Sequence, residues 1–216
     1  MTSGLAKRFW ESIDYEEHLS RGIKNYLRAE AKKLRKLVRN DSVVLDVGCG
    51  SGRCIALLKK TARKIVGVDY STKMIKKAFK KVGKCSNVEL FLENAESMPF
   101  ADNSFDYVLC MFNTLGVLDG SKEKALMEIK RVVKPKGKIF ASVYSENALD
   151  EQVKEYTEYL GLTIKKIDAD AVYTKKGFVS ERFGRAKIKR LFGSAGLKAG
   201  IIKLTPIAYF IEACRE

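Results

Sequence analysis

Several residue types are scarce in this chain, and each scarcity narrows what the protein can be. The 216 residues include one histidine, His18, one tryptophan and one glutamine, Gln152. The five cysteines form no Cys-x-x-Cys pair. Because a structural zinc site normally needs paired cysteine and histidine ligands at short spacing, the sequence argues against a metal site. The odd number of cysteines and the lack of an export signal favour reduced thiols over disulfides.

Long apolar runs are also missing. No stretch approaches the roughly 18 consecutive apolar residues that a membrane-spanning helix needs. The N-terminal segment MTSGLAKRFWESIDYEEH lacks the apolar core of a secretory signal. We therefore expect a cytoplasmic protein without a membrane span. With 46% hydrophobic residues, the length fits a single domain over residues 1–216.

Positive charge is in excess, with 41 Lys and Arg against 26 Asp and Glu and a net charge of +15. Two interpretations stay open. The lysines are scattered along predicted helix faces, and the dominance of Lys and Glu over Gln resembles a thermophile-like composition. Alternatively, the basic surface binds an acidic partner such as RNA. The second interpretation predicts that basic residues cluster around the opening of the binding site. The candidates for such a cluster are Lys175, Lys176, Arg182, Arg185, Lys187, Lys189 and Arg190.

Hydrophobic periodicity predicts alternating helices and strands. Apolar residues recur at helical spacing from Leu19 to Val38, and short aliphatic runs then follow at 43–47, 64–69, 88–92, 105–110 and 138–144. Helical segments are predicted between most of these runs, and Ser71 is suited to cap one of them. Pro135 to Gly137 predicts a turn before the fifth strand. Continuous apolar runs suit strands buried on both faces, so the pattern predicts an α/β fold with a parallel sheet.

The end of the chain has a different pattern. Residues 149–161 are predicted to be helical, and residues 171–174 and 177–180 to form a strand pair around Lys175 and Lys176. A helix carrying Ile188, Leu191 and Phe192 follows. Two apolar runs on either side of Pro206 then predict a closing hairpin.

The strongest candidate site is the sequence Leu45-Asp46-Val47-Gly48-Cys49-Gly50-Ser51-Gly52 at the end of the first strand. Glycines there let the backbone approach a ligand, and parallel sheets bind ligands at the carboxyl ends of their strands. The spacing G-x-G-x-G differs from the G-x-G-x-x-G of dinucleotide sites. Asp46 at the strand end suits a cationic ligand, such as one that bears an ammonium and a sulfonium.

Three further strand ends carry polar groups. Asp69 follows the second strand, where a carboxylate can accept hydrogen bonds from ribose hydroxyls. Asn94-Ala95-Glu96 follows the third strand, where a carbonyl could accept from an adenine amine. Met111, Phe112, Asn113 and Thr114 follow the fourth strand, next to the place where a reacting group would lie.

Taken as an ordered set, these segments resemble the class I S-adenosylmethionine-dependent methyltransferases, specifically the small-molecule type with an E/D-x-G-x-G-x-G first motif. The matching segments are VLDVGCGSGRCIALL, VGVDYSTKMIKKA, LENAESMPFADNSFDYVLC and EIKRVVKPKGKIFASVY, from about Asn40 to Tyr144. The resemblance implies S-adenosylmethionine as the cofactor. It assigns cofactor contacts to Asp46, Gly48, Cys49, Gly50, Gly52, Asp69, Tyr70, Met74, Asn94, Ala95, Glu96 and Met111. Asn94 stands where many relatives carry aspartate, and its amide oxygen can still accept a hydrogen bond.

The resemblance also implies the architecture. We expect a Rossmann-like, doubly wound seven-stranded sheet, mostly parallel, whose last strand is antiparallel and spans Ile207 to Ala213. Residues 145–183 would be an insertion that caps the substrate, and residues 1–40 an N-terminal helical lid. The sequence leaves the oligomeric state open.

Methyl transfer from a sulfonium is an in-line displacement, for which an enzyme mainly aligns the reactants and excludes water. A general base is needed only if the acceptor loses a proton. The candidate catalytic residues are Asn113, His18 and Tyr15. Asn113 could equally serve only to shape a turn, and His18 and Tyr15 lie in the N-terminal segment. Tyr173 and Phe178 could line a substrate cap, although core packing is the commoner role of aromatic residues.

Two subclasses are disfavoured. No Asn/Asp-Pro-Pro-aromatic motif follows the fourth strand, and Cys110 is followed by Met111 rather than forming a Pro-Cys nucleophile. The first hypothesis is a methyltransferase acting on nitrogen or oxygen of a small molecule. The alternatives are an RNA or protein methyltransferase that uses the basic surface, an inactive cofactor-binding subunit, and an NAD-dependent oxidoreductase, which the glycine spacing disfavours.

Overall fold

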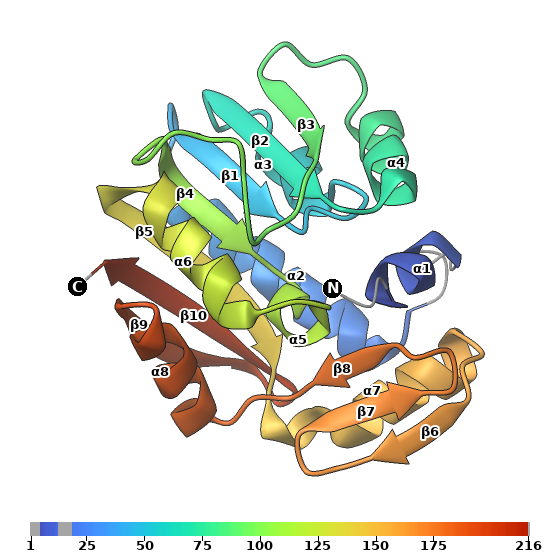
Figure 1. Cartoon of the computed structure of the whole chain (residues 1–216). Helices are drawn as coiled ribbons and strands as arrows, with labels where there is room; N and C mark the ends of the chain where they lie inside the picture. Colours follow the sequence, from blue (N-terminus) through green and yellow to red (C-terminus); the bar gives the residue numbers. More distant parts are fainter. Residues whose placement is uncertain (1–4, 13–18, 216) are drawn as a thin grey trace.

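The computed structural model describes residues 5–12 and 19–215, and a seven-stranded sheet forms its centre (Figure 1). The strand order is β3-β2-β1-β4-β5-β10-β9. These strands are β1 (Val43–Val47), β2 (Lys64–Asp69), β3 (Val88–Leu92), β4 (Phe105–Cys110), β5 (Val133–Tyr144), β9 (Leu197–Thr205) and β10 (Ala208–Arg215). The main helices are α1 (Leu5–Ser12), α2 (Arg21–Leu37), α3 (Arg53–Leu58), α4 (Thr72–Val82), α5 (Thr114–Val117), α6 (Lys122–Val132) and α8 (Arg185–Ser194).

The sheet has the predicted mixed pairing. β1 pairs in parallel with β2 and β4, and β5 continues the parallel set beside β4. β10 pairs antiparallel with both β5 and β9. The order reverses direction at β1, which lies between β2 and β4 in the sheet, so the carboxyl end of β1 is the topological switch point. The Rossmann-like fold with an antiparallel last strand is therefore confirmed.

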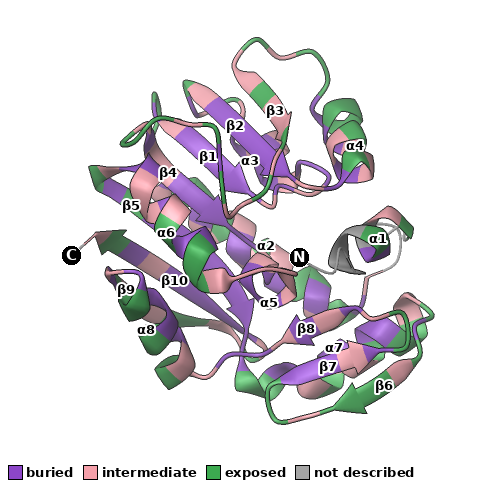
Figure 2. Ribbon diagram, in the orientation of Figure 1, coloured by how far each residue is buried: buried purple, intermediate pink, exposed green. Residues whose placement is uncertain are grey.

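Helices cover both faces of the sheet (Figures 1 and 2). Apolar side chains of α6 and α8 pack on one face, where Leu126, Ile129 and Phe192 belong to the core. On the other face α2 and α3 pack through Leu34 and Ile55. The central strands are buried on both sides, which explains their unbroken aliphatic sequences. Among the described residues, no helix is both long and apolar enough to cross a membrane.

Some predicted details were wrong. The expected turn at Pro135–Gly137 lies inside β5, which already begins at Val133. The strand pairs Val133 with Phe105 and Lys138 with Tyr107, so the intervening residues bulge out of the ladder. Proline lacks an N–H and cannot donate a hydrogen bond to the neighbouring strand. A bulge leaves this residue unpaired without ending the strand. The helix expected over 149–161 is divided into α7 (Leu149–Lys154) and the π-helical turn η2 (Glu155–Tyr159).

A second, three-stranded sheet is formed by residues between β5 and α8. The predicted strand pair is present as β7 (Ala171–Thr174) and β8 (Val179–Glu181), and a third strand, β6 (Ile164–Ile167), lies beside β7. The sequence did not reveal β6 because its residues, Ile-Lys-Lys-Ile, are mostly exposed. Below, this segment with the turn η1 (Glu146–Ala148), α7 and η2 is called the insertion.

The insertion packs against α1 and against Tyr70 of the main domain. The rings of Phe9 in α1 and Phe178 stack with centroids 3.9 Å apart. Tyr156 and Val172 complete a small apolar cluster with them, against which Tyr70 of the main domain packs. Phe178 is thus a core residue, as its aromatic character predicted.

Arg182 anchors the insertion from inside, and we expect Arg182→Met to lower the free energy of unfolding by about 2–4 kcal/mol. Its guanidinium donates to Gln152 Oε1 at 2.9 Å and to the carbonyls of Asp168 and Ala169 at 2.7 and 3.1 Å. Arg182 is 2% exposed and Gln152 is fully buried, so the change would leave the Gln152 acceptor without its partner inside the protein. Urea unfolding measures the change. Arg190→Met, an exposed change on α8, is the control, and equal effects of both changes would contradict the prediction.

Candidate functional site

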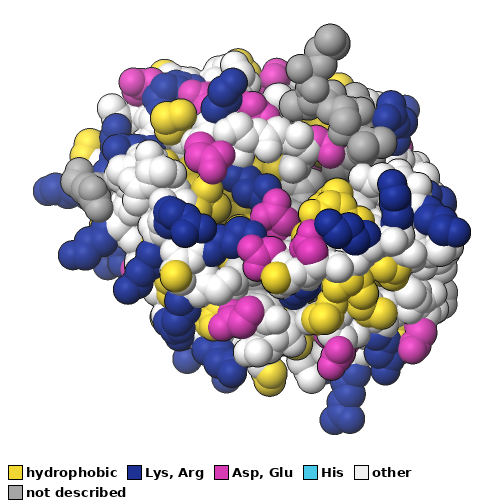
Figure 3. Space-filling view, turned by 60° about the horizontal axis from the view of Figure 1, so that its bottom comes forward, with side chains coloured by type: hydrophobic (Ala, Val, Ile, Leu, Met, Phe, Trp, Pro, Cys, Tyr) yellow, Lys and Arg dark blue, Asp and Glu magenta, His cyan; other side chains and the backbone are white. Residues whose placement is uncertain are grey.

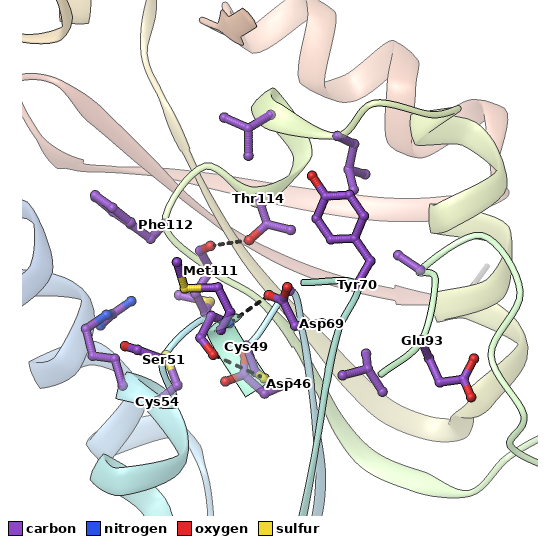
Figure 4. Close-up of a pocket in the computed structure, with 18 of the residues that line it drawn as sticks. Asp46, Cys49, Ser51, Cys54, Asp69, Tyr70, Glu93, Met111, Phe112 and Thr114 are labelled. Carbon is purple, nitrogen blue, oxygen red and sulfur yellow. Dashed lines mark hydrogen bonds between the residues drawn. The ribbon is translucent and has the colours of Figure 1, made fainter. Parts of the chain in front are cut away.

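A pocket lies at the carboxyl ends of β1, β2, β3 and β4 (Figure 4). Its volume is about 480 Å³, within the usual range for small-molecule sites. All predicted cofactor-binding residues except Gly52 line this pocket. The pocket also receives Leu19 and Leu27 from the α2 region. The sheet topology thus gathers residues that are far apart in the sequence.

The loop after β1 is shaped by glycines with positive φ. Gly48 has φ +67° and Gly50 has φ +53°, a region that other residues rarely adopt. A Cβ atom on Gly48 would lie 2.5 Å from Thr114 Cγ2, so glycine is required there for space as well as for conformation. Gly52, the third predicted glycine, does not line the pocket. It is the N-cap of α3 with φ +81°, and a Cβ atom at this position would lie 3.1 Å from the Ala78 Cβ atom, so glycine allows α4 to pack against the loop.

Asp46 is the most unusual charged group of the pocket. It is 2% exposed, and its Oδ2 atom has no hydrogen-bond partner among the described residues. Burial raises the pKa of Asp46 to about 7, and the neighbouring Arg53 opposes this shift. An unpartnered buried carboxylate facing a pocket is costly unless a ligand compensates it. The geometry therefore suits a ligand with a positively charged hydrogen-bond donor.

Asp69 lies across the loop from Asp46 and shapes the loop itself. Its Oδ2 atom accepts from the Gly50 amide and its Oδ1 atom from the Ser71 amide, both at 2.9 Å. Burial raises the pKa of Asp69, although these amides and that of Tyr70 counteract the effect. Each carboxylate oxygen has a second lone pair, so Asp69 can still accept from hydroxyl groups of a ligand.

The far end of the pocket is suited to a flat ring. Tyr70 and Met74 line it on the side of β2 and α4, and Asn94, Ala95 and Glu96 on the side of β3. Asn94 Oδ1 accepts from the Glu96 amide at 3.0 Å, which fixes the turn of this loop. Glu96 in turn accepts from the Ser121 amide at 3.1 Å. These hydrogen bonds hold the loop edge in place beside the pocket.

The segment after β4 contains residues that line the pocket and one buried residue, Asn113, that does not. Met111, Phe112 and Thr114 line the pocket, and Thr114 Oγ1 donates to the Met111 carbonyl at 2.7 Å (Figure 4). Asn113 does not line it. Its Nδ2 atom donates to Ser180 Oγ and to the Glu181 carbonyl, both at 3.2 Å, and its Oδ1 atom accepts from the Tyr144 amide at 3.1 Å. The backbone of Asn113 has φ +59°. Its side-chain hydrogen bonds link β5 to β8 of the insertion.

We expect Asn113→Ala to lower the free energy of unfolding by about 2–3 kcal/mol while leaving the affinity for a pocket ligand nearly unchanged. The change removes three hydrogen bonds, two of them buried, and places alanine in a left-handed conformation. Thermal unfolding and ligand titration measure the two effects. Asn103→Ala is the control, because Asn103 is also left-handed (φ +57°) but exposed. A large loss of ligand affinity in Asn113→Ala would contradict the prediction.

Comparison with known proteins identifies the family. A model of the methyltransferase domain matches residues 44–137. A demethylmenaquinone methyltransferase from Staphylococcus aureus is 31% identical over 168 residues, which cover 74% of this chain and 69% of that protein. The chain belongs to the class I S-adenosylmethionine-dependent methyltransferases.

Other relatives agree with this placement. The ubiquinone/menaquinone biosynthesis C-methyltransferase UbiE from Klebsiella pneumoniae is 35% identical over 128 residues, 56% of this chain. The chain spans about half the length of that relative, since the match covers 50% of it. A solved protein from Pyrococcus horikoshii superposes with a TM-score of 0.76 at 22% identity and covers 97% of this chain and 99% of its own. A methyltransferase structure from Aquifex aeolicus has a TM-score of 0.68 at 20% identity, with 96% and 97% covered.

The pocket of this methyltransferase fits the cofactor of its family, S-adenosylmethionine. The ammonium of the methionine part would satisfy the orphaned Oδ2 atom of Asp46. The open space above Gly50, where a Cβ atom would meet nothing within 4 Å, leaves room for the ligand beside the loop. Asp69 lies at the end of β2, where it would hold the ribose, and Tyr70 lies beside the expected place of the adenine.

Sequence reasoning missed several pocket residues of the methyltransferase. Arg53, Lys77, Lys81, Val117 and Leu118 also line it. Arg53 directly follows the last glycine of the motif, and the two lysines recur at i, i+4 on α4, so both signals were present in the sequence. The two lysines fit a solvated helix face equally well, because the sequence does not show which face of α4 borders the loop.

The seven basic residues that an RNA-binding site would use do not gather at the pocket. None of them lines it, and Arg182 is buried. Lys187 pairs with Asp170 and Glu181 at 3.1 and 3.0 Å. Figure 3 shows Lys and Arg side chains spread over one face with acidic side chains between them. The remaining catalytic candidates, His18 and Tyr15, lie outside the described residues.

Proposed function

We propose that this chain transfers a methyl group from S-adenosylmethionine to a carbon atom of a small, largely apolar acceptor. The observation that carries the proposal is an apolar part of the pocket lining. It is formed by the side chains of Leu19, Leu27 and Phe112, which pack against one apolar cluster of the protein. Such a wall favours a hydrophobic ring over a sugar or a phosphate group.

The names of two relatives support a carbon acceptor. The Klebsiella pneumoniae protein is a C-methyltransferase of quinone biosynthesis, and the Staphylococcus aureus protein a demethylmenaquinone methyltransferase. This proposal replaces the nitrogen or oxygen acceptor expected from sequence patterns, which had no information on the acceptor. An electron-rich aromatic ring would provide both a nucleophilic carbon atom and an apolar surface that the pocket would bind.

When bound, the cofactor supplies a methyl group on a positively charged sulfur, which leaves as a neutral thioether. The acceptor carbon forms the new C–C bond and afterwards loses its proton. The residues of the chain align the two reactants and exclude water. Asp46 would hold the ammonium end and Asp69 the ribose, and Met111 and Phe112 line the same pocket.

The catalytic candidates have different places in this proposal. We propose Asn113 as a positioning residue, because its amide groups bind Ser180, Glu181 and Tyr144 instead of facing the pocket. His18 and Tyr15 stay candidates for the base that accepts the acceptor's proton. They precede Leu19 in the sequence, and Leu19 lines the pocket. The insertion lines no part of the pocket, so we propose that it supports the wall at Tyr70 instead of contacting the acceptor.

A methyl-transfer assay tests the proposal. Purified chain is incubated with methyl-labelled S-adenosylmethionine and separately with hydroquinones, catechols, aliphatic amines and total RNA. We expect label in hydroquinones, and NMR of the product should locate the methyl group on a ring carbon. Leu27→Asn, which places an amide in the apolar wall, should raise the KM for the hydroquinone without weakening binding of S-adenosylhomocysteine. Label found in RNA alone, or on oxygen or nitrogen, would overturn the proposal.

A further inference from the structure

Three helices on one face of the sheet carry many positive charges and almost no negative ones. α2, α3 and α4 pack on the same apolar core, and α3 contacts both of the others. All three lie within the described residues 19–215, and their only acidic residue is Glu30. Glu30 is fully buried and forms a salt bridge with Arg53. The exposed side of these three helices therefore bears no carboxylate.

The exposed side of α2 is a stripe of cations. The buried residues of this helix recur at spacings of three and four, so its exposed residues share the opposite side. At 3.6 residues per turn, they fall within an arc of about 120°. Apart from Asn25, they are all basic, and we call these six cations the α2 stripe: Arg21, Lys24, Arg28, Lys32, Arg35 and Lys36.

The α2 stripe is not neutralised within the protein. None of its side chains has a hydrogen bond or salt bridge to another residue in the described part of the chain. Several members, such as Arg28 and Lys32, stand four residues apart, where like charges repel each other and destabilise a helix. An anionic partner on this side of α2 would offset the repulsion.

The basic face continues on α4 and includes an exposed aromatic ring. Lys76 and Lys80 of α4 are exposed. Phe79 is 63% exposed, the largest fraction for any large apolar side chain among the described residues. Lysines and arginines together with an exposed aromatic ring are typical of protein surfaces that bind at the boundary between the headgroups and acyl chains of a membrane.

An anionic membrane fits this face better than RNA does. Lipid phosphates attract Lys and Arg side chains near the surface, and the boundary region takes up aromatic rings. Proteins that bind single-stranded RNA stack several bases on aromatic side chains, whereas the α2 stripe contains no aromatic residue. The proposed acceptor is apolar and would dissolve in a bilayer, and α2 also carries Leu27, which lines the pocket.

We propose that the α2 stripe and Phe79 form a surface that binds membranes containing anionic lipids, from which the chain takes its acceptor. This inference rests on the proposed function where it prefers a membrane to RNA, because that preference uses the apolar acceptor. Binding to the membrane itself needs neither cofactor nor acceptor.

Co-sedimentation of the whole chain with lipid vesicles tests the surface. Vesicles of phosphatidylcholine alone are compared with vesicles that also contain phosphatidylglycerol. We expect binding to the anionic vesicles only, with release at high salt. Arg28→Gln with Lys32→Gln should weaken this binding about 25-fold, roughly fivefold for each cation removed. Lys189→Gln with Arg190→Gln removes the same charge from exposed positions of α8 and should weaken it less than about threefold.

Phe79→Ser tests the apolar part of the surface. It should weaken binding to the anionic vesicles about tenfold, because the ring no longer leaves water. Met127→Ser is the control, since Met127 is 51% exposed on α6, on the other face of the sheet. Equal losses in a variant and its control would overturn the inference. So would equal binding to both kinds of vesicle, or binding to RNA without binding to vesicles.

A methylation assay separates this surface from the pocket. Arg28→Gln with Lys32→Gln should slow methylation of a hydroquinone carried in anionic vesicles and leave the rate with a water-soluble hydroquinone unchanged. Equal slowing with both acceptors would contradict a role of the surface in acceptor uptake. If the chain bound anionic vesicles as expected but methylated no hydroquinone, the proposed function would be wrong and the membrane-binding surface would remain.

Discussion

Replacing Asp46 by asparagine is expected to stabilise the ligand-free protein and to remove tight binding of S-adenosylmethionine. Burial raises the pKa of Asp46 from 3.8 to about 7. Because the folded chain holds this proton more tightly than the unfolded chain, the group's contribution to stability is lost as pH rises from about 4 to 7. Above pH 7 the ionised carboxylate is a cost to the fold of up to about 4 kcal/mol, at 1.4 kcal/mol per pKa unit. Asparagine removes the charge but buries an amide, so we expect a net gain of roughly 1–3 kcal/mol at pH 8.

The measurement is thermal unfolding of both proteins between pH 4 and pH 8, together with ligand titration at pH 8. The stability difference should be near zero at pH 4 and reach its full value above pH 7, with a rise in Tm of about 3–10 °C. Affinity for S-adenosylmethionine should fall about 30–100-fold, because a neutral amide replaces the carboxylate that meets the ammonium. A pH-independent stability difference, or unchanged affinity, would contradict the prediction.

Asp106→Asn is a control of opposite sign. Partial burial raises the pKa of Asp106, but hydrogen bonds from Lys134 and from the Val43 amide outweigh it and keep this pKa below its usual value. Its carboxylate accepts from both groups at 2.7–2.8 Å at the amino end of the sheet, away from the pocket. The change should therefore destabilise the protein above the carboxyl's usual pKa and leave cofactor binding intact. The pair of variants separates the cost of charge at the pocket from a general effect of removing an aspartate.

The strands and the glycine loop could be predicted because their signals are local. Each buried strand is a short aliphatic run, and β1, β2, β3 and β4 have the predicted bounds. Ser71 caps α4 as expected, since its side chain accepts from the Met74 amide. Strand ends in a parallel sheet converge on one edge, so the polar residues after β1, β2 and β3 could be placed together without a structure.

Contacts between distant segments could not be predicted in the same way. Glu30 lies on the buried face of α2 with Ile23, Tyr26 and Leu34. A glutamate on an apolar stripe is a visible irregularity, but the sequence does not show that Arg53 is its partner. Asn113 follows β4 as the pocket residues do, yet its left-handed backbone directs the side chain toward β8. Side-chain direction at a loop depends on tertiary contacts that no local pattern encodes.

The loop after β1 supplies the second large effect: Gly48→Ala is expected to destabilise the protein by about 3 kcal/mol or more and to prevent cofactor binding. The left-handed backbone costs an alanine about 1–2 kcal/mol, and the new methyl group would lie 2.5 Å from Thr114 Cγ2. Thr114 cannot easily turn away, because its hydroxyl is bound to the Met111 carbonyl. The loop must therefore shift, and its shift moves the amides that border the cofactor site. Unfolding in urea and titration with S-adenosylhomocysteine measure both effects.

Gly50→Ala is the matched control for Gly48→Ala, since Gly50 has a similar positive φ but no atom within 4 Å of a new Cβ. It should lose about 1–2 kcal/mol from backbone strain alone. Adding Thr114→Ser to Gly48→Ala removes the clashing methyl group and keeps the hydroxyl, so part of the stability and of the ligand affinity should return. Equal effects at both glycines, or no rescue by the serine, would contradict the prediction. Backbone conformation alone would then explain the need for glycine at position 48, and the contact between Gly48 and Thr114 would not.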